Sequence, residues 1–355
     1  MSSDFYKLTI EEVVKETEDC VSLSFGIPDE LKDKFSFYSG QYLTLKQEID
    51  GADLRRSYSL CSEPSSGVHK VAIKQVEKGV FSTFANVSIK KGDSIECFPP
   101  AGNFKHIPSP KSEKNYVLFA AGSGITPILS ILKSILLHEE KSTVNLFYGN
   151  KGFSSVIFRE EIEALKNNFI NRLSVTHIFS KENLGNRIQK GRIDEEKCEY
   201  LYDAFLKDTV IDDIYICGPE QMTLSIREVS VRRGVPSSKI HLELFGTSIK
   251  KVKSVVAKNT PSFDSVIELK LDGDEFEFPL NSEGENILDA AQKTGIDLPF
   301  ACKGGVCCTC KAKVLEGNVS MDVNYGLEQD EIENGYVLTC QAHPTTEKVI
   351  ISFDD

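Results

Sequence analysis

The spacing of apolar and polar residues changes twice along the 355-residue chain, which indicates three structural units. Up to about Pro108, short alternating segments such as residues 42–45 and 71–76 are separated by clusters of Gly, Pro and Ser. Because successive side chains of a strand point to opposite faces, this pattern is typical of a small antiparallel β-barrel. We predict such a barrel over residues 1–110.

In the central part of the chain, from Tyr116 to about Phe245, apolar runs of strand length alternate with helical stretches. Alternation of this kind is typical of a parallel sheet that is covered by helices on both faces. It predicts an α/β domain over residues 111–247. The predicted strands are residues 117–121, 144–148, 173–179, 214–217 and 240–244.

The last part of the chain begins after a segment, residues 248–262, that mixes lysines with small residues and favours an exposed linker. Beyond it, residues 266–271 and 276–280 flank an Asp-Gly pair and predict a hairpin. A helix is expected over residues 287–294, followed by a cysteine-rich loop and short strands. We predict a compact α+β module over residues 263–355.

One apolar segment, residues 116–137, is about long enough to cross a bilayer. Gly122, Pro127 and Lys133 interrupt it, so a strand, a tight turn and a buried helix explain it better. The first residues lack the basic start and apolar core of a signal peptide. We therefore expect a cytoplasmic protein with no stable membrane insertion.

The formal net charge of −12 is unevenly distributed. Residues 263–355 contain 19 acidic and 6 basic residues, whereas the rest of the chain is almost neutral. Because phosphate contacts need clustered Lys and Arg, this distribution argues against nucleic-acid binding. The acidic module either improves solubility or docks to a partner, and the charge alone leaves both open.

Four of the ten cysteines predict a metal site. Cys302, Cys307 and Cys310 have the C-x4-C-x2-C spacing, and Cys340 follows a predicted strand far downstream. This is the ligand pattern of a plant-type 2Fe-2S cluster. A structural zinc site is the alternative, although zinc ribbons normally supply paired C-x2-C knuckles. Cys308 interrupts the pattern, and we expect it to be a small buried residue rather than a ligand.

A flavin site is suggested by the motif Arg55-Arg56-Ser57-Tyr58-Ser59, which ends a predicted barrel strand. Arg56 could pair with pyrophosphate, Tyr58 could lie against the isoalloxazine, and Ser59 could hydrogen-bond near its reactive nitrogen. Downstream, a turn at Gly79 that leads through Phe81 to Ser82 could bring amides to the phosphates. An ordinary strand with an exposed arginine is the simpler explanation of the motif taken alone.

A nucleotide site is suggested by the glycine-rich turn that follows the first strand of the α/β domain. In it, Gly122 and Gly124 would allow pyrophosphate to approach a helix, with Thr126 as N-cap and Pro127 in the first turn. Tight strand-to-helix packing is the alternative. The string Ile216-Cys217-Gly218-Pro219 ends a later strand, where α/β sheets bind ligands, and Cys217 is either a nicotinamide neighbour or a core residue.

With these three motifs in this order, the chain resembles the ferredoxin-NADP reductase superfamily, specifically members fused to a C-terminal plant-type ferredoxin. The strings RRSYS, AAGSGITP, ICGP and LPFACKGGVCCTCKAKV carry the resemblance, which covers essentially the full length. It implies a multidomain protein with FAD on the antiparallel barrel, NADPH on the α/β domain and a 2Fe-2S cluster on a β-grasp ferredoxin domain. FMN in place of FAD is less expected, because residues 100–104 offer an adenine-holding loop.

The resemblance also implies roles for individual residues. Ser59, Cys217, Glu243 and Phe245 would be catalytic, with Glu243 either handling a proton or serving as a plain strand carboxylate. Cys302, Cys307, Cys310 and Cys340 would bind the metal. The cofactor-binding residues would be Arg56, Tyr58, Ser59, Lys74, Gly79, Phe81, Ser82, Gly122, Gly124, Thr126, Pro127, Asn150, Lys151, Ser180, Lys181, Arg192, Gly218 and Pro219.

NADPH is expected over NADH because Lys151, Lys181 and Arg192 follow successive strands, where the 2′-phosphate would lie. Solvated surface cations are the alternative. The resemblance further implies an oxygenase partner, most closely a multi-subunit diiron enzyme that acts on a coenzyme A thioester. There are two competing hypotheses. The chain is either the reductase of another oxygenase or desaturase, or a redox sensor with vestigial flavin sites.

Overall fold

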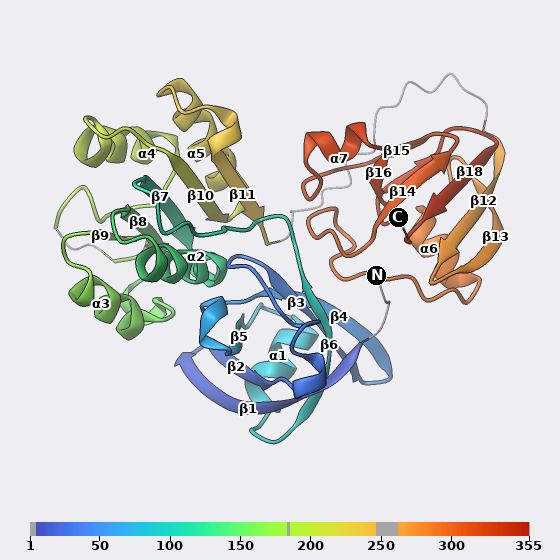
Figure 1. Ribbon diagram of the computed structural model, residues 1–355, viewed down its shortest axis with the longest axis horizontal. Helices are drawn as coiled ribbons and strands as arrows, with labels where there is room; N and C mark the ends of the chain where they lie inside the picture. Colours follow the sequence, from blue (N-terminus) through green and yellow to red (C-terminus); the bar gives the residue numbers. More distant parts are fainter. Residues whose placement is uncertain (1–4, 183–184, 246–261, 355) are drawn as a thin grey trace.

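The computed structural model describes residues 5–182, 185–245 and 262–354, and it contains three sheet-based units (Figure 1). The predicted linker over residues 248–262 lies outside the described residues except for Ser262. The first unit is antiparallel, the second is parallel and the third is mixed, so the predicted fold class is confirmed.

The N-terminal unit is a six-stranded antiparallel sheet in the order β4-β3-β6-β1-β2-β5. An antiparallel bridge between Leu60 and Val71 joins the end of β4 to β5 and closes the sheet into a barrel. Its interior is filled by alternate residues of the strands, such as Leu8, Leu23 and Leu43, none of which is exposed. The elements are β1 Tyr6–Thr17, β2 Cys20–Gly26, β3 Tyr42–Ile49, β4 Ala52–Ser59, β5 His69–Lys74, α1 Val80–Val87 and β6 Ser94–Ala101.

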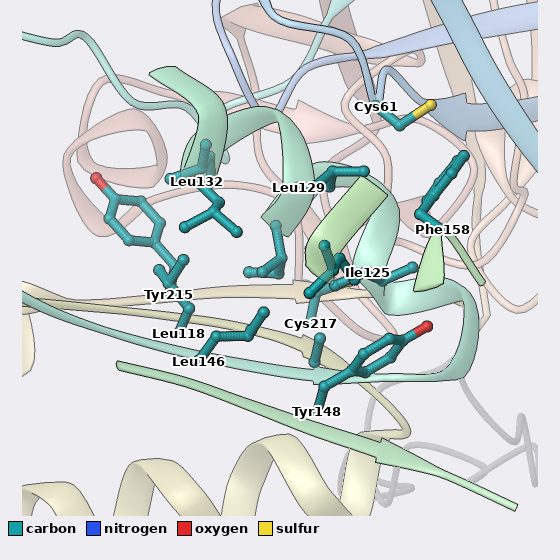
Figure 2. Close-up of a cluster of buried hydrophobic side chains, with 14 of the residues drawn as sticks. Cys61, Leu118, Ile125, Leu129, Leu132, Leu146, Tyr148, Phe158, Tyr215 and Cys217 are labelled. Carbon is teal, nitrogen blue, oxygen red and sulfur yellow. The ribbon is translucent and has the colours of Figure 1, made fainter. Parts of the chain in front are cut away.

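The central unit is a five-stranded, wholly parallel sheet in the order β11-β10-β7-β8-β9. On one face, helix α2 packs Ile125, Leu129 and Leu132 against the sheet (Figure 2). The strands are β7 Asn115–Ala121, β8 Thr143–Asn150, β9 Leu173–Phe179, β10 Asp213–Gly218 and β11 Ile240–Leu244. The helices are α2 Ile125–His138, α3 Arg159–Asn168, α4 Glu195–Leu201 and α5 Glu220–Arg232.

The C-terminal unit contains a mixed sheet in the order β13-β12-β18-β14-β16, in which only β12 and β18 run parallel, and a separate antiparallel pair of β15 and β17. Its core consists of residues from the unit itself, including Ile267, Leu288 and Val349. The strands are β12 Asp264–Leu271, β13 Asp274–Asn281, β14 Lys311–Glu316, β15 Val319–Met321, β16 Tyr336–Leu338, β17 Ala342–Pro344 and β18 Lys348–Ser352. The helices are α6 Ile287–Lys293 and α7 Gln329–Glu333.

The start of helix α2 differs from its prediction. Thr126 is not the N-cap, because a short 3-10 turn over Gly122–Gly124 leads directly into a helix that begins at Ile125. The Thr126 hydroxyl instead donates a hydrogen bond to the carbonyl of Ser123 at 3.0 Å. Gly122, which has a positive φ, allows the chain to coil before Thr126 is reached, and the sequence pattern alone does not predict this.

None of the helices among the described residues has the length and apolar character that crossing a bilayer would require. The apolar segment over residues 116–137 forms strand β7, a turn and most of helix α2, as predicted. Most of its apolar side chains are buried, and Leu137 at its end is exposed.

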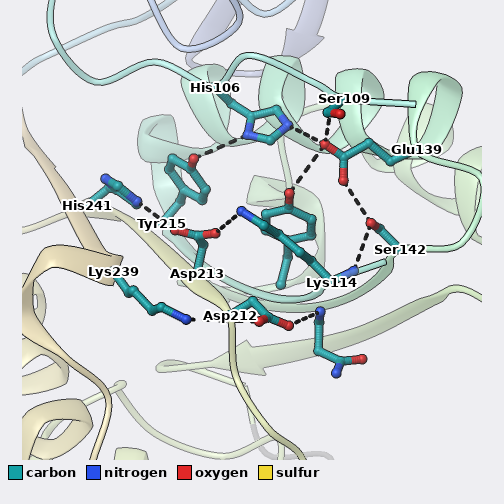
Figure 3. Close-up of polar contacts among 12 residues, drawn as sticks. His106, Ser109, Lys114, Glu139, Ser142, Asp212, Asp213, Tyr215, Lys239 and His241 are labelled. Atoms are coloured by element: carbon teal, nitrogen blue, oxygen red, sulfur yellow. Dashed lines mark hydrogen bonds and ion pairs between the residues drawn. The ribbon is translucent and has the colours of Figure 1, made fainter. Parts of the chain in front are cut away.

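The barrel and the parallel sheet are joined by a buried polar network around Glu139 (Figure 3). His106, in the segment that follows β6, lies 3.2 Å from the Glu139 carboxylate, which also accepts hydrogen bonds from the Ser142 hydroxyl and the Ser109 amide. Burial alone would raise the pKa of Glu139, but these hydrogen bonds outweigh burial and lower it to about 2. The carboxylate therefore stays charged and fixes one unit against the other.

Candidate functional site

One cavity of about 670 Å³ is lined by all three units of the chain. Its volume lies in the range of sites that hold a cofactor or a drug-sized ligand. Predicted flavin residues, predicted nucleotide residues and two of the predicted metal ligands share this single space. The lining consists of Tyr42, Arg56, Ser57, Tyr58, Ser59, Ala72, Lys74, Gln75, Val76, Gly79, Val80, Phe81, Ser82, Ser123, Thr126, Glu243, Leu244, Phe245, Cys302, Gly304, Val306 and Cys307.

The barrel side of the cavity is formed by the end of β4 and the start of α1. Arg56 is exposed in the cavity, and its Nη1 donates a hydrogen bond to the Arg55 carbonyl at 2.7 Å. The ring centroids of Tyr58 and Phe81 lie 5.8 Å apart, and the two rings form an aromatic wall of the cavity. A cation and an aromatic wall in one cavity fit the pyrophosphate and the ring system of a flavin dinucleotide.

The turn before helix α1 supplies backbone groups to the same cavity. Gly79 is the N-cap of α1 in extended conformation, and Val80 and Phe81 follow it along the cavity wall. The Ser82 hydroxyl accepts a hydrogen bond from the Val76 amide and donates one to the Gly79 carbonyl, so it stabilises the turn. Lys74 also lines the cavity, and its Nζ lies 3.5 Å from Asp19.

Glu243 and Ser59 meet where the barrel faces the parallel sheet. The Ser59 hydroxyl donates a hydrogen bond to Glu243 Oε2 at 3.2 Å, although the two residues are 184 positions apart. Burial raises the pKa of the Glu243 carboxyl to about 8, against a smaller opposite effect of this hydrogen bond. Glu243 is therefore mostly protonated at neutral pH, and Phe245 lies beside it, 44% exposed in the cavity.

Cys217 is not part of the cavity wall. Its side chain is fully buried in the core beneath α2, in the same cluster as Ile125 and Tyr148 (Figure 2). Its backbone pairs with Glu243 on the neighbouring strand. Core packing alone is sufficient to explain a cysteine at this position. A role of Cys217 beside nicotinamide stays a prediction.

The glycine-rich turn reaches the cavity through Ser123 and Thr126. Gly122 has φ +55°, a conformation that favours glycine, and a Cβ at Gly124 would overlap with the Cys217 carbonyl oxygen. Gly218 approaches Met222 so closely that a Cβ there would overlap with its terminal methyl. The glycines thus hold β7, α2 and β10 close together at the carboxyl edge of the sheet, where α/β sheets bind ligands.

The remaining predicted nucleotide residues are spread along this edge. Pro127 is buried inside helix α2, and Pro219 precedes α5. Asn150 is buried at the end of β8, and neither of its amide atoms has a hydrogen-bond partner among the described residues. An unpaired buried amide fits a ligand that supplies the missing partner. The Ser180 amide donates a hydrogen bond to the Asn150 carbonyl, and the Lys181 amide donates one to the Lys151 carbonyl.

A second cavity, of about 590 Å³, lies beside α4 and contains the predicted residue Arg192. Arg187, Lys190 and Lys197 line it as well, although Arg187 pairs with Glu196 at 3.1 Å. These three cations were missed from the sequence because they do not directly follow a strand. Lys151 and Lys181 are exposed and do not line this cavity.

The cysteine loop carries three of the four predicted ligands, and Cys340 follows β16. Cys302 Sγ accepts hydrogen bonds from the amides of Gly304 and Cys307 at 3.3 and 3.4 Å, and the Cys302 amide donates to Cys307 Sγ at 3.4 Å. The loop turns through Lys303 and Gly305, both with positive φ. The neighbouring Cys307 and Cys340 side chains lower the pKa of Cys302 below its ordinary value.

These contacts fit a 2Fe-2S cluster better than the alternatives. The side chains of Cys307 and Cys340 both affect the pKa of Cys302, and Cys340 affects that of Cys310, so the four predicted ligands lie near one another. Amides directed at the sulfurs are typical of iron-sulfur sites. Cys308 points elsewhere, because its thiol donates to the Gly326 carbonyl at 2.9 Å and burial raises its pKa to about 12.

Comparison with known protein families gives three matches. An oxidoreductase FAD-binding domain matches residues 7–106, an oxidoreductase NAD-binding domain matches residues 118–228, and a 2Fe-2S iron-sulfur cluster binding domain matches residues 269–345. The order of the three domains agrees with the order of the motifs.

Curated proteins of similar length are also similar to the chain. A subunit of the 1,2-phenylacetyl-CoA epoxidase from Escherichia coli (strain K12) is 42% identical, with 99% of this chain and 98% of that protein covered. The ferredoxin reductase component of 3-ketosteroid-9-alpha-monooxygenase from Rhodococcus rhodochrous is 35% identical, with 98% and 96% covered. Among solved structures, phthalate dioxygenase reductase has the same fold, with a TM-score of 0.60, 21% identity and 98% of both chains covered.

Proposed function

The chain belongs to the family of FAD- and NAD-binding oxidoreductases with a 2Fe-2S domain that are reductase components of oxygenases, and from this premise we propose its pathway and cofactor roles. Electrons pass from NADPH through FAD and the cluster to an oxygenase of the phenylacetyl-CoA epoxidase type. The cavity that all three units line carries the proposal, because donor, carrier and acceptor sites meet there.

Residues of the barrel hold FAD in this proposal. Arg56 pairs with the pyrophosphate, Tyr58 and Phe81 flank the ring system, and the turn at Gly79 supplies amides near the phosphates. When bound, FAD accepts two electrons as a hydride and releases them one at a time, and the cluster carries one electron. Ser59 and Glu243 hold a proton at the edge of the cavity, and Phe245 covers the face that nicotinamide must approach.

The four cysteines Cys302, Cys307, Cys310 and Cys340 are the proposed cluster ligands. The loop amides directed at Cys302 and Cys307, and the effect of Cys340 on the pKa of Cys310, support this role. We also propose the domain division at residues 110, 247 and 262, which the three family matches accommodate. All ten cysteines are free, which supports a reducing, cytoplasmic compartment.

Preference for NADPH over NADH is the least direct part of the proposal. Lys151, Lys181 and Arg192 are exposed beside the carboxyl edge of the parallel sheet and form no ion pair within the described residues. Arg192 shares its cavity with further cations, and clustered positive charge favours a 2′-phosphate over a 2′-hydroxyl. Gly122, Gly124, Thr126, Pro127, Asn150, Ser180, Gly218 and Pro219 shape the nucleotide site in this proposal.

The oxygenase partner is proposed from the relatives. The 42% identical protein is named as a subunit of an epoxidase that acts on phenylacetyl-CoA, and we propose a multi-subunit diiron partner of this kind. The steroid monooxygenase reductase is less similar, at 35% identity, and makes a steroid system the second candidate.

An anaerobic titration tests the core of the proposal. Stoichiometric NADPH should bleach flavin absorbance and produce the paramagnetic signal of a reduced 2Fe-2S cluster, while NADH at equal concentration should react more slowly. Purified protein that contains zinc in place of iron, or whose flavin and cluster do not respond to either nucleotide, would refute the reductase assignment. Co-purification with tagged epoxidase subunits tests the partner.

A further inference from the structure

The motif Arg55-Arg56-Ser57-Tyr58-Ser59 contains an arginine that the flavin site does not use. Because side chains alternate along a strand, Arg55 and Arg56 leave β4 on opposite faces. Arg56 enters the flavin cavity, whereas Arg55 points to the ferredoxin module, the C-terminal unit over residues 262–354. Arg55 is only 4% exposed, and a buried cation is stable only where it is paired.

Arg55 crosses from the barrel to the ferredoxin module. Its Nη2 lies 2.8 and 3.1 Å from the two carboxylate oxygens of Asp297, and its Nη1 donates to the Leu298 carbonyl at 3.5 Å. The guanidinium also lies over the Phe300 ring at 4.5 Å. Three types of contact, to a carboxylate, a carbonyl and an aromatic face, suit the planar fork of arginine and no other cation.

The partners of Arg55 on its own side come from the barrel. Asp53 Oδ2 lies 3.0 Å from Nη2 and 3.3 Å from Nε, and the Phe5 ring lies 5.2 Å from the guanidinium carbon. Arg55 is thus held by one carboxylate within its own unit and by a second carboxylate across the interface. Because Arg55 has one carboxylate partner in each unit, the contact across the interface and the contact within the barrel can be removed separately by experiment.

The contacts of Arg55 adjoin the cysteine loop. Asp297, Leu298 and Phe300 directly precede Ala301 and Cys302, the first cluster ligand. On the neighbouring strand β3, the buried Tyr42 packs against Ala301 and Cys307, and its hydroxyl lies 3.2 Å from Thr309 Oγ1. The strand pair β3–β4 therefore contacts the loop on both sides of its first two cysteines.

We infer that Arg55 is a positioning residue for electron transfer within the chain: through Asp297 it docks the cysteine loop at the flavin cavity. The inference rests on the proposed function, because it assigns Arg55 to the step from flavin to cluster. Each electron gained by the ferric cluster is one lost by reduced FAD, so this step requires no further reactant. Its rate depends on how closely the loop is held, and Arg55 contributes nothing to hydride uptake from NADPH.

A matched pair of variants tests the inference in the full-length holoprotein. Asp297→Asn weakens the contact across the interface, whereas Asp53→Asn weakens the equivalent contact within the barrel. For Asp297→Asn we expect cytochrome c reduction, which draws on the cluster, to fall about tenfold, because the buried Arg55 guanidinium loses its charged partner across the interface. Ferricyanide reduction, which draws on flavin directly, should stay at the wild-type rate. Asp53→Asn should retain both activities.

Hydrogen exchange supplies a readout that does not depend on activity. Amides of residues 298–310 should exchange faster in Asp297→Asn than in wild type, and at the wild-type rate in Asp53→Asn. Arg55→Lys, which retains the charge but not the fork, should resemble Asp297→Asn. Equal losses in both Asp→Asn variants, or wild-type exchange and cytochrome c reduction in Asp297→Asn, would overturn the inference. If NADPH did not reduce the flavin of the wild-type protein, the proposed function would be refuted instead. The hydrogen-exchange data would still test the docking role of Arg55.

Discussion

At the scale of single residues, the most informative group in the cavity is the Glu243 carboxyl. Burial raises its pKa to about 8, so it is neutral at the pH where most carboxylates are charged. A raised pKa in a cavity beside a predicted cofactor is typical of a functional group. A neutral carboxyl there is compatible with a flavin that gains negative charge as it takes up hydride.

Glu243→Gln should remove a pH dependence of flavin reduction by NADPH. In the wild type we expect the rate to fall by about tenfold or more as pH rises through 8, because the ionised carboxylate opposes the incoming charge. The uncharged amide of the variant cannot titrate, so its profile should be flat across that range. Stopped-flow absorbance at a series of pH values measures this, and an unchanged profile would assign the transition to another group.

The same pKa has a consequence for stability. Because the folded-state pKa lies above the ordinary value of 4.5, the folded protein holds this proton more tightly than the unfolded chain. The associated stability is fully present at pH below 4.5 and is lost as pH rises towards 8. Ser59, the hydrogen-bond partner of Glu243, opposes the shift, so Ser59→Ala should move the transition to higher pH.

At the scale of elements, the turn between β7 and α2 shows how closely the backbone is packed at the nucleotide edge. A Cβ on Gly124 would overlap with the carbonyl oxygen of Cys217, which belongs to the neighbouring strand β10. The overlap is with backbone, which cannot rotate away as a side chain would. Close packing is therefore sufficient to require glycine here, whether or not a pyrophosphate binds.

Gly124→Ala should destabilise the α/β domain by about 1–3 kcal/mol, the usual cost of overpacking a well-packed core. It should also weaken NADPH binding, because the turn that approaches the nucleotide must shift. Urea unfolding and nucleotide titration measure the two effects. Gly149→Ala is the control, since the nearest atom to its new Cβ would be Ile193 Cδ1 at 3.4 Å. If both variants were equally stable, the steric argument would be wrong.

Element boundaries were predictable where a pattern is strong. The strands over residues 173–179 and 240–244 have the predicted bounds, because apolar and polar residues largely alternate along both segments, as in a strand. The start of α2 was not predictable, since the 3-10 turn at Gly122 depends on contacts with other strands. Capping rules assume an isolated helix, and here the packing of the sheet decides where the helix begins.

At the scale of the whole molecule, the ferredoxin module has a core of its own, built within residues 267–351. Cys310→Ala should therefore abolish the cluster signal while NADPH still reduces flavin at close to the wild-type rate. Iron analysis and paramagnetic resonance measure the cluster, and stopped-flow absorbance measures the rate of flavin reduction. Loss of flavin reduction in a folded, FAD-loaded variant would show that the units are not independent.

The three units and their cofactor motifs were predictable because each motif is largely local: a glycine turn, an arginine before Tyr58, and three of the four metal-binding cysteines within one loop. Their meeting in one cavity was not predictable, because it depends on contacts between residues more than 180 positions apart, such as Ser59 with Glu243 and Arg55 with Asp297. Tyr42 was missed for the same reason, since nothing in a strand sequence indicates which unit its hydroxyl will contact. Local motifs can be recognised in a sequence, whereas the relative placement of domains depends on contacts between their folded surfaces.

The hairpin β3–β4 turns at Asp50-Gly51, both with positive φ, as in the tight two-residue turns that match strand twist. That turn fixes which of two adjacent arginines faces inward to the cofactor and which faces outward to the neighbouring unit. A slip of one residue would exchange every side chain between the faces of the strand. One turn of the chain therefore positions both Arg56 in the flavin cavity and Arg55 against the ferredoxin module. A register error in this hairpin would misplace both arginines at once.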